Sequence, residues 1–595
     1  MKPLVIRVGG EAGKGIATAA DILGRIFLRL GYEVFSTKDY ASQIKGGHNY
    51  HTLRISDTNV KADVKGVDLL LALDKQTLLQ HLPAMNENGI VIYDEKSVVE
   101  KHALEKSLSS IQFLPLPIAK IEVDVHAKNL HNAILVGAAL KVLGLEVELC
   151  LDEIRQQFKE KEKVKESLLK GAGQGYALVK KNYSLFLPGN PLQGIHKKES
   201  TTVLWSGNEA VVQGALDAGV QFHVQYPMTP VSAILHSLAH EAAARKDLIV
   251  LQAEDEIAVI NMALGASYAG KRAMTATSGG GFALMVEGLS LASMAEIPLV
   301  IIEGQRPGPA TGLPTKTEQG DLQFVLNSGT GDFPIAVIAP SNIEDCYTET
   351  KRAFYLAEKY QLPVIILIDK HLAENFKTFD LQKEKNNFVC DFSRRFNMVA
   401  AEGNVQDKFL NRKFLNKDGL YMRYAPDNLQ RTIPGTLNGI YTCAGDEHNE
   451  VGYIIEDSAT RKKMMVRRMG KLNKIMGELP APQLLGSEEA KLTLVGWGSM
   501  RGVLEEVAVR LADGGIKANL LILKYMSPFL GENVKELLSL AKRILLVENN
   551  YSGQLGELIA QKTGCLIREK ILRYDGSAFT VDELYDEIKE KLNMD

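Results

Sequence analysis

The stretch LQAEDEIAVINMALGASYAGKRAMTATSGGGFALM, residues 251–285, decides the fold of the central part of this chain. It contains the end of an apolar strand, an apolar helix, a second strand through RAMTATS and a glycine turn that opens another apolar helix. Strands that alternate with helices in this way are typical of an α/β domain with a parallel sheet. The first helix is so strongly apolar that we expect it to be buried.

Three carboxylates, Glu254, Asp255 and Glu256, stand at the junction between the first strand and its helix. Carboxylates in a first turn favour the helix dipole, so helix capping accounts for one of the three. Capping does not explain why Glu256 directly precedes an apolar helix. A carboxylate at the rim of a buried helix is partly desolvated, which suits it to proton exchange.

Polar residues also follow other strands of this block. The stretch VQYPMTPVSAI, residues 224–234, contains two prolines that hold Tyr226 and Thr229 in extended geometry. Ser278 ends the strand RAMTATS, and Arg306 stands in a loop rich in glycine and proline. Open α/β sheets bind ligands at the carboxyl ends of their strands, and a guanidinium pairs well with a carboxylate. The pattern therefore predicts a site at this sheet edge.

The rest of the chain adds two further α/β regions, so the fold class we expect is α/β with three such domains. The boundaries expected from the pattern are 1–190 for a first α/β domain, a linker near 187–200, 200–390 for the central domain, 391–487 for an irregular segment with a basic helix, and 488–595 for a last α/β domain. A length of 595 residues is consistent with several domains.

The composition is that of an ordinary globular protein, with 45% hydrophobic and 24% charged residues and a net charge of −3. This balance argues against a nucleic-acid partner. The five cysteines form no C-x-x-C pair, which suits a reducing cytoplasm and makes zinc or iron–sulfur ligation by this chain alone unexpected. No apolar run approaches the ~20 residues that span a bilayer. We therefore expect a soluble cytoplasmic protein without a membrane partner.

A glycine-rich turn, GGEAGKG, lies near the start of the chain between a strand and a helix. Its glycines are Gly9, Gly10, Gly13 and Gly15. Backbone amides in this context can hold a phosphate. The spacing is one residue short of a P-loop, and Gly15 stands where that motif has Ser or Thr. A tight turn that needs small residues and a phosphate or coenzyme site are equally compatible with the pattern.

Four motifs in this order resemble the 2-oxoacid:ferredoxin oxidoreductases, in the form whose α and γ subunits are fused. The motifs are YPMTPVS (226–232), EDEIAVINMALGASYAGKRAMTATSGGGFALMVEG (254–288), GQRPGPATGLPTKTEQGDL (304–322) and GDEHNEVGYIIED (445–457). Met228 replaces the isoleucine usual in the first motif. The resemblance covers almost the whole length. It implies a γ-type domain at 1–190, a thiamine-pyrimidine-binding domain at 200–390 and a transketolase C-terminal-like domain at 488–595.

The resemblance also implies roles for individual residues. Glu256 would hydrogen-bond N1′ of the thiamine aminopyrimidine and so promote removal of the C2 proton. Arg306 would bind the carboxylate of the 2-oxoacid, and Thr229 would donate a hydrogen bond beside it. The remaining implied contacts are Tyr226, Pro227 and Met228 to the substrate, and Pro230 and Ser278 to the cofactor. The implied reaction is oxidative decarboxylation, with coenzyme A taking the acyl group and ferredoxin taking the electrons.

Two features of such enzymes are missing from the chain. It has no GDG segment to hold the diphosphate and Mg²⁺, and no cysteine set for a [4Fe-4S] cluster. The resemblance implies that a separate β subunit carries both. We therefore expect an active site formed with β, in an (αβ)2 heterotetramer.

The motif GDEHNE favours 2-oxoglutarate as substrate, with pyruvate and branched-chain 2-oxoacids as alternatives. A dicarboxylate needs a second cation, and Lys45 in QIKGGHNYH is a candidate, although a solvated lysine is the more common finding in such a loop. Gly9, Gly10, Gly13 and Gly15 are candidates for coenzyme A contact. Two other functional classes stay open: a non-redox thiamine-dependent transferase or decarboxylase, and a non-catalytic acyl- or nucleotide-binding scaffold.

Overall fold

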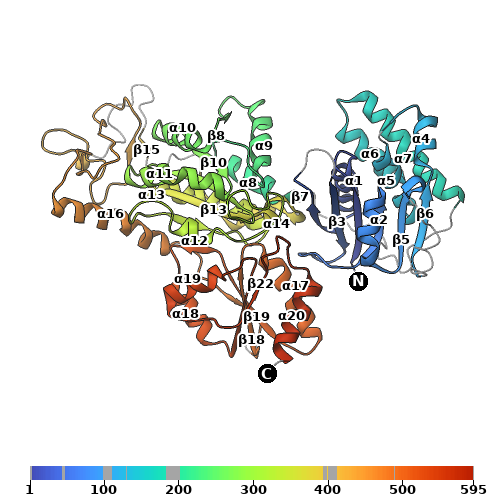
Figure 1. Cartoon of the computed structure of the whole chain (residues 1–595). Coiled ribbons are helices and arrows are strands. Elements are labelled where there is room, and N and C mark those ends of the chain that lie inside the picture. The colour runs from blue at the N-terminus through green and yellow to red at the C-terminus, as the bar shows by residue number, and fades with distance from the viewer. Residues whose placement is uncertain are drawn as a thin grey trace. The chain divides into compact units, whose positions relative to one another are not determined.

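The computed structural model describes residues 3–42, 47–97, 110–128, 130–182, 201–392, 398–399, 412–487 and 489–593. Lys45 and the linker predicted near 187–200 lie outside these residues. The chain divides into two compact units (Figure 1). Unit 1 comprises Met1–Trp205, Glu374–Gln382 and Thr580–Leu584, and unit 2 comprises the rest.

Unit 1 is built on an eight-stranded mixed sheet in the order β6-β5-β4-β1-β3-β2-β14-β7. Its strands are β1 (Leu4–Glu11), β2 (Glu33–Asp39), β3 (His48–Ser56), β4 (Val67–Ala72), β5 (Met85–Asp94), β6 (Gln112–Leu116), β7 (Thr202–Ser206) and β14 (Phe376–Asp380). The strands β1, β4, β5 and β6 run parallel, whereas β3 pairs antiparallel with both β1 and β2. Both β7 and β14 come from the range 200–390, so the chain leaves unit 1 and later returns to it.

The helices of unit 1 are α1 (Ile16–Arg29), α2 (Lys75–His81), α4 (Ile118–Val125), α5 (His131–Val142), α6 (Glu148–Gln157) and α7 (Glu162–Asn182). The charged run at 156–171 is divided between α6 and α7. Phe158, between the two helices, is partly buried and packs against the core of unit 1. Helix α5 is buried on almost every side and packs closely against α7.

The central sheet of unit 2 has seven strands in the order β20-β12-β13-β11-β10-β8-β9, all parallel except β20. The strands are β8 (Phe222–Gln225), β9 (Ile249–Gln252), β10 (Ala273–Thr277), β11 (Leu299–Gln305), β12 (Ala336–Ile338), β13 (Pro363–Asp369) and β20 (Tyr525–Ser527). Their helices are α8 (Gly207–Asp217), α9 (Ser232–Ala242), α10 (Glu256–Tyr268), α11 (Gly279–Met294), α12 (Leu322–Leu326), α13 (Ile343–Tyr360), α14 (Lys370–Glu374) and α15 (Leu381–Asn387).

The C-terminal part of the chain forms a second sheet, β17-β19-β18-β21-β22. Its elements are β17 (Leu484–Leu485), β18 (Leu492–Trp497), β19 (Ala518–Leu523), β21 (Arg543–Glu548), β22 (Lys570–Leu572), α17 (Met500–Asp513), α18 (Gly531–Ser539), α19 (Gln554–Thr563) and α20 (Val581–Asn593). Strand β20 from this part pairs with β12 of the central sheet. One hydrophobic core contains side chains from both sheets, so the two α/β regions of unit 2 fold as one body.

In the described part of the segment between these regions, the longest element is the basic helix α16 (Ser458–Met476). The Asp457 side chain caps it by accepting a hydrogen bond from the amide of Thr460. The observed architecture confirms the predicted α/β class. Among the described residues, no helix combines the length and the apolar character that crossing a membrane requires.

The contact between α5 and α7 gives a matched pair of variants. A β-carbon at Gly175 would lie 2.1 Å from the carbonyl oxygen of Ile134, whereas one at Gly173 meets nothing within 4 Å. We predict that Gly175→Ala destabilises unit 1 by about 1–3 kcal/mol through overpacking against backbone. Gly173→Ala should stabilise α7 by about 0.5–1 kcal/mol, because alanine favours helix more than glycine does. Hydrogen exchange of α5 and α7 peptides checks both, and equal exchange in the two variants would contradict the packing argument.

Candidate functional site

At the N-terminus of α10, the three carboxylates that are adjacent in sequence lie in different environments. Asp255 is the helix cap, and its side chain accepts a hydrogen bond from the amide of Ala258 at 2.8 Å. Glu254 is exposed. Glu256 is only 3% exposed, and its Oε1 accepts a hydrogen bond from the hydroxyl of Thr277 at 3.5 Å. Capping therefore uses Asp255 and leaves Glu256 as a buried carboxylate with another role.

A bare glycine makes room for this carboxylate. A β-carbon at Gly281 would lie 2.3 Å from Oε1 of Glu256 and 2.1 Å from the hydroxyl oxygen of Thr277. Burial raises the pKa of Glu256, while hydrogen bonds from its own backbone amide and from Thr277 oppose that shift. A carboxyl group in this state exchanges a proton with a nitrogen base more readily than an exposed one does.

The loop after β8 is held in place by its neighbours. Arg306 donates a hydrogen bond from Nη1 to the carbonyl oxygen of Thr229 at 3.0 Å. Asn208 donates to the carbonyl oxygen of Pro230 at 2.9 Å, and Gln225 donates to that of Val231 at 3.1 Å. The structure thus brings Arg306 and Thr229 together at one sheet edge, as expected from strands that precede them both.

The other residues predicted in this loop differ in exposure. Tyr226 is exposed, Pro227 and Met228 are half-buried, and Pro230 is buried. Ser278 is fully buried at the start of α11, and its hydroxyl has no hydrogen-bond partner among the described residues. A buried hydroxyl without a hydrogen-bond partner is a candidate for contact with a ligand.

The loop that carries Arg306 is anchored by the C-terminal sheet. Gln319 donates from its side chain to the carbonyl oxygen of Trp497 at 3.0 Å and accepts from the amide of Asn549 at 3.1 Å. The amide of Thr317 donates to the carbonyl oxygen of Gly576 at 3.0 Å. The last domain thereby sets the conformation of a loop in the central one.

Sequence reasoning missed a group of acids near this loop. Glu303 lies on β11 and is fully buried, and the β-carbon position of Gly279 is 2.6 Å from a carboxylate oxygen of Asp321. Burial raises the pKa of Asp321 to about 6 and that of Glu318 to about 7. One signal was available: strand alternation puts Glu303 on the same face as the core residues Leu299 and Ile301.

The glycine motif of unit 1 differs from its predicted form. Strand β1 continues to Glu11, so Gly9 and Gly10 belong to the strand and pair with Tyr50 and Asn49 of β3 rather than forming the turn. Close packing explains the glycine at position 9, because a β-carbon there would lie 2.7 Å from the methyl group of Thr77.

The turn itself contains Gly13 and Gly15, whose φ angles are 91° and 76°. A β-carbon at Gly15, which precedes α1, would lie 2.5 Å from the side-chain amide of Asn132. Between the two glycines, Lys14 lies 3.6 Å from a carboxylate oxygen of Glu11. The turn therefore contains two glycines in the left-handed region and a lysine that is already paired with Glu11.

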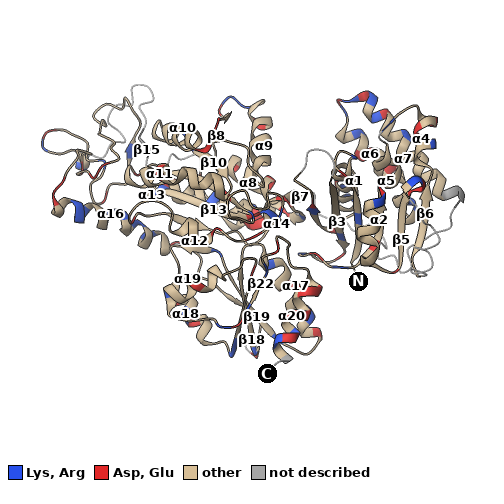
Figure 2. Ribbon diagram, in the orientation of Figure 1, with Lys and Arg blue, Asp and Glu red and all other residues tan. Residues whose placement is uncertain are grey.

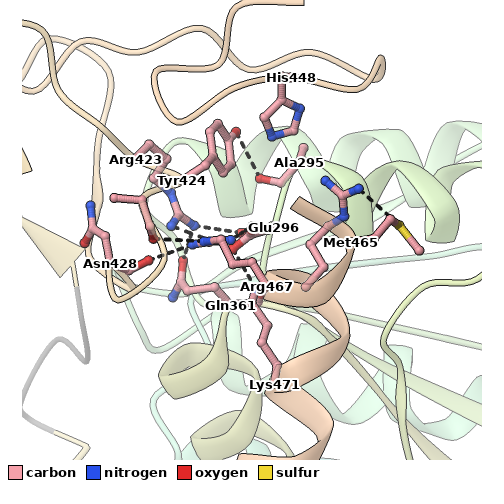
Figure 3. A network of polar contacts seen from close by, with 12 residues as sticks. Ala295, Glu296, Gln361, Arg423, Tyr424, Asn428, His448, Met465, Arg467 and Lys471 are labelled. Atoms are coloured by element: carbon pink, nitrogen blue, oxygen red, sulfur yellow. Dashed lines mark hydrogen bonds and ion pairs between the residues drawn. The ribbon is translucent and has the colours of Figure 1, made fainter. Parts of the chain in front are cut away.

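The segment GDEHNE contacts helix α16 rather than the loops above. Glu447 accepts two hydrogen bonds from Arg468, at 2.8 and 2.6 Å. Beside it, Glu296 is buried against Lys471 at 2.6 Å and against Arg467 and Arg423 (Figure 3). These charges bind α16 and the irregular segment to the central domain.

This network and Arg306 lie at opposite ends of β11. Glu296 precedes the seven-residue strand and Arg306 follows it, so roughly 20 Å of strand separates them. Within this chain, GDEHNE therefore lies away from the loop that carries Thr229. Its contacts with helix α16 give the motif a structural role. They do not indicate which 2-oxoacid is the substrate.

We predict that Glu296→Gln destabilises unit 2 by about 3–5 kcal/mol at pH 7, because it leaves buried cations without a counter-charge. Burial raises the pKa of Glu296, but Lys471, Arg467 and Arg423 outweigh burial and hold it well below its usual range. Such a depressed pKa stabilises the folded state above the unfolded pKa, and this contribution is lost as pH falls.

The difference in melting temperature between Glu296→Gln and wild type should therefore shrink below about pH 4.5. The exposed Glu287 on α11 offers a control, and Glu287→Gln should change the melting temperature little at either pH. A pH-independent difference for Glu296→Gln would contradict the assignment of the network's stability to charge.

Comparisons with known proteins agree with the three α/β regions described above. Three family models match: "Pyruvate flavodoxin/ferredoxin oxidoreductase, thiamine diP-bdg" at 213–428, "Pyruvate ferredoxin/flavodoxin oxidoreductase" at 5–178, and "Pyruvate:ferredoxin oxidoreductase core domain II" at 490–584. A 2-oxoacid:ferredoxin oxidoreductase subunit alpha from Sulfolobus is 33% identical, over 97% of this chain and 95% of the relative. The 2-oxoglutarate oxidoreductase subunit KorA of Mycobacterium tuberculosis is 28% identical, over 98% of this chain and 91% of the relative.

Among solved structures, the 2-oxoglutarate:ferredoxin oxidoreductase from Magnetococcus marinus, with 2-oxoglutarate, coenzyme A and succinyl-CoA bound, superposes with a TM-score of 0.84. The match has 29% identity and covers 99% of this chain and 100% of the other. The motifs, the fold and the relatives agree, and the chain belongs to the 2-oxoacid:ferredoxin oxidoreductase family as an α subunit with a thiamine diphosphate-binding domain.

Proposed function

We propose that this chain, with a separate β subunit, oxidatively decarboxylates 2-oxoglutarate with coenzyme A to an acyl-CoA, CO₂ and reduced ferredoxin. The observation that carries the proposal is the buried Glu256 beside the bare Gly281, at the sheet edge where Arg306 contacts Thr229. The chain would work in the cytoplasm, and its five free cysteines support a reducing compartment.

The residues around Glu256 fit the pyrimidine part of thiamine diphosphate. Glu256 supplies a carboxyl with a raised pKa for a ring nitrogen, Ser278 supplies a hydroxyl that lacks a partner, and Pro230 supplies a buried apolar wall. When bound, the cofactor supplies a carbon nucleophile and accepts the electron pair released with CO₂. Glu256 would hold the proton that moves at the ring.

Arg306 and Thr229 would bind the 2-oxoacid. The Arg306 guanidinium donates to the backbone of Thr229 through one nitrogen, and its planar geometry matches that of a carboxylate. Tyr226, Pro227 and Met228 would line the same loop. Holding the loop rigid before the substrate arrives lowers the entropic cost of binding.

An apolar surface supports the need for a partner. On α10 and α11 the side chains of Ile257, Met262 and Leu284 are 52%, 43% and 49% exposed. These helices have few charged residues, and α10 is drawn almost entirely tan in Figure 2. We infer that β covers this face and brings the diphosphate and Mg²⁺ site and the [4Fe-4S] cluster, in an (αβ)2 assembly.

The choice of 2-oxoglutarate draws on the Magnetococcus structure and on the KorA relatives. The Sulfolobus relative is named for 2-oxoacids in general, which keeps pyruvate and branched-chain 2-oxoacids as alternatives. In the proposal, Lys45 binds the second carboxylate, and the turn around Gly13 and Gly15 contacts coenzyme A. Residues 1–190 would serve as the γ-type domain, 200–390 as the pyrimidine domain and 488–595 as the transketolase C-terminal-like domain.

The test is to purify the chain with and without its co-expressed partner and to measure reduction of a viologen dye. Reduction should require the partner, thiamine diphosphate, coenzyme A and a 2-oxoacid, and 2-oxoglutarate should give the highest kcat/KM in a panel. A complex that reduces dye with none of the 2-oxoacids would reject the function, and a preference for pyruvate would correct only the substrate.

We predict that Glu256→Gln assembles with the partner but loses roughly 10²–10⁴-fold in kcat, because it removes a proton-transfer group. Size-exclusion chromatography checks assembly, and dye reduction checks turnover. Unimpaired turnover would remove Glu256 from the mechanism.

Variants of two adjacent glycines test whether the position of Glu256 matters, without mutating Glu256 itself. A β-carbon at Gly281 would strike the Glu256 carboxylate, whereas one at Gly280 meets only a carbonyl oxygen at 4.0 Å. We predict that Gly281→Ala lowers kcat at least about tenfold, since a displacement of about 1 Å can cost 10²-fold, while Gly280→Ala stays near wild type. Equal rates in the two variants would show that the position of Glu256 is not critical.

A further inference from the structure

A polar cluster that the proposed reaction does not use lies in unit 1, where α2 contacts strands β1 and β3. The motif QIKGGHNYH contributes His48 and Tyr50 of β3, strand β1 contributes Arg7, and His81 ends α2. Nε2 of His48 lies 2.8 Å from Nε2 of His81, and Nη1 of Arg7 lies 3.3 Å from Nδ1 of His81. These contacts join Arg7, His81 and His48 into what we call the histidine network.

The aromatic ring of Tyr50 packs against every member of this network. Its centroid lies 4.6 Å from that of the His81 ring and 5.9 Å from that of the His48 ring. The guanidinium carbon of Arg7 lies 5.1 Å from the same centroid, and Nε of Arg7 donates to the hydroxyl of Thr52 at 2.9 Å. Arg7 and His81 are both buried, so the contact between them is largely shielded from water.

The contact with Arg7 fixes the direction of the hydrogen bonds. A guanidinium has only donors, so Nδ1 of His81 accepts, and the proton of neutral His81 lies on Nε2. Nε2 of His81 therefore donates to Nε2 of His48. The proton of His48 then lies on Nδ1, which has no acceptor among the described residues. The opposite direction would place a proton on Nδ1 of His81, where it would face the donor of Arg7.

Protonation of either histidine removes one of these contacts. A second proton on His81 would lie on Nδ1 and face Arg7, and a second proton on His48 would lie on Nε2 and face the Nε2 proton of His81. Burial, followed by the charge of Arg7 and by His48, lowers the pKa of His81 to about 3. Burial also lowers the pKa of His48. Both histidines are therefore neutral in the folded chain at neutral pH.

Two carboxylates oppose this effect. Asp74 raises the pKa of both histidines, and Asp39 of β2 raises that of the histidine on β3. Asp74 has other contacts, because it caps α2 by accepting from the amide and the hydroxyl of Thr77 and lies 4.0 Å from the ammonium group of Lys14. Tyr50 is uncharged, since burial raises its pKa to about 12. Burial and Arg7 thus outweigh the two carboxylates.

The histidine network ends beside the glycine turn. Glu11, the last residue of β1, pairs with His48, the first residue of β3. The amide of Ala12 in the turn donates to the carbonyl oxygen of Gly47 at 3.4 Å. A β-carbon at Gly9 would lie 3.3 Å from the His48 ring, so this ring packs closely on β1 as well. A shift of His48 would therefore move the strand end from which the turn starts.

We propose that Arg7 and His81 position His48, and with it the turn at Gly13 and Gly15, only while both histidines are neutral. The inference rests on the function proposed above, in which this turn contacts coenzyme A. Members of the histidine network are positioning residues, because they act on coenzyme A through the turn. Loss of the network should weaken the binding of coenzyme A and leave the binding of the 2-oxoacid unchanged.

The kinetic test uses the complex of the chain with its co-expressed partner. A glutamine amide has an acceptor for Arg7 and a donor for His48, whereas leucine has neither. His81→Leu should therefore raise KM for coenzyme A about tenfold, and His81→Gln should stay within about threefold of wild type. KM for the 2-oxoacid should change in neither variant. Equal KM values for coenzyme A in the two variants would overturn the proposal.

Peptide-resolved hydrogen exchange of the full chain tests the pH dependence without turnover. A depressed pKa in the folded state stabilises the closed form above about pH 6.5, the ordinary histidine value, and this contribution is lost as pH falls. Between about pH 7 and about pH 5.5, each histidine should lower the protection of β3 and α2 peptides about eightfold. The expected fall is therefore about 60-fold in wild type and about eightfold in His81→Gln.

The control for both measurements is His240→Gln, a change of an exposed histidine on α9 that should retain the wild-type values. An equal fall of protection in wild type and His81→Gln would overturn the proposal, because the two histidines would then not resist protonation together. A complex that turns over no 2-oxoacid would reject the proposed function, and hydrogen exchange would still test the histidine network.

Discussion

The site of this chain depends on the close approach of two helix N-termini. Helix α10 begins at Glu256 and α11 begins at the glycines 279–281, and the carboxylate of Glu256 occupies space that any side chain at Gly281 would need. Asp255 caps α10, so Glu256 is free to lie inward. A buried carboxylate is costly, and the protein retains it here because α11 offers no side chain in its place.

The C-terminal sheet also stabilises this edge of the central sheet. Gln319 contacts both Trp497 and Asn549 through its amide group, and β20 extends the central sheet beside β12. These contacts give the loop that carries Arg306 a defined shape without using the loop's own charged residues. At the other end of β11, Glu296 and the cations of α16 fix the irregular segment, so each end of the strand has its own polar anchor.

Much of this could be predicted from sequence because it is local. The apolar periodicity of 256–268, the glycines at 279–281 and the prolines around Thr229 each predict a strand end or a helix start, and parallel strands bring such points together. What could not be predicted depends on packing between distant segments. Gly9 and Gly10 belong to a strand because they pair with β3, and the contact between Glu447 and Arg468 joins residues that no periodicity relates. Strand alternation indicates that Glu303 is buried, but it does not show which groups surround a single acid in an apolar strand.

The return of the chain to unit 1 has a consequence for how this part of the protein can be separated. Strand β14 pairs with β2, and both β7 and β14 come from residues after 200. A fragment that ends near residue 190 would leave β2 as an exposed edge with unpaired amides and carbonyls, which invites pairing with other chains. A free-standing version of this domain would need charged residues, a proline or a covering segment along β2. The fusion therefore supplies edge protection as well as connection.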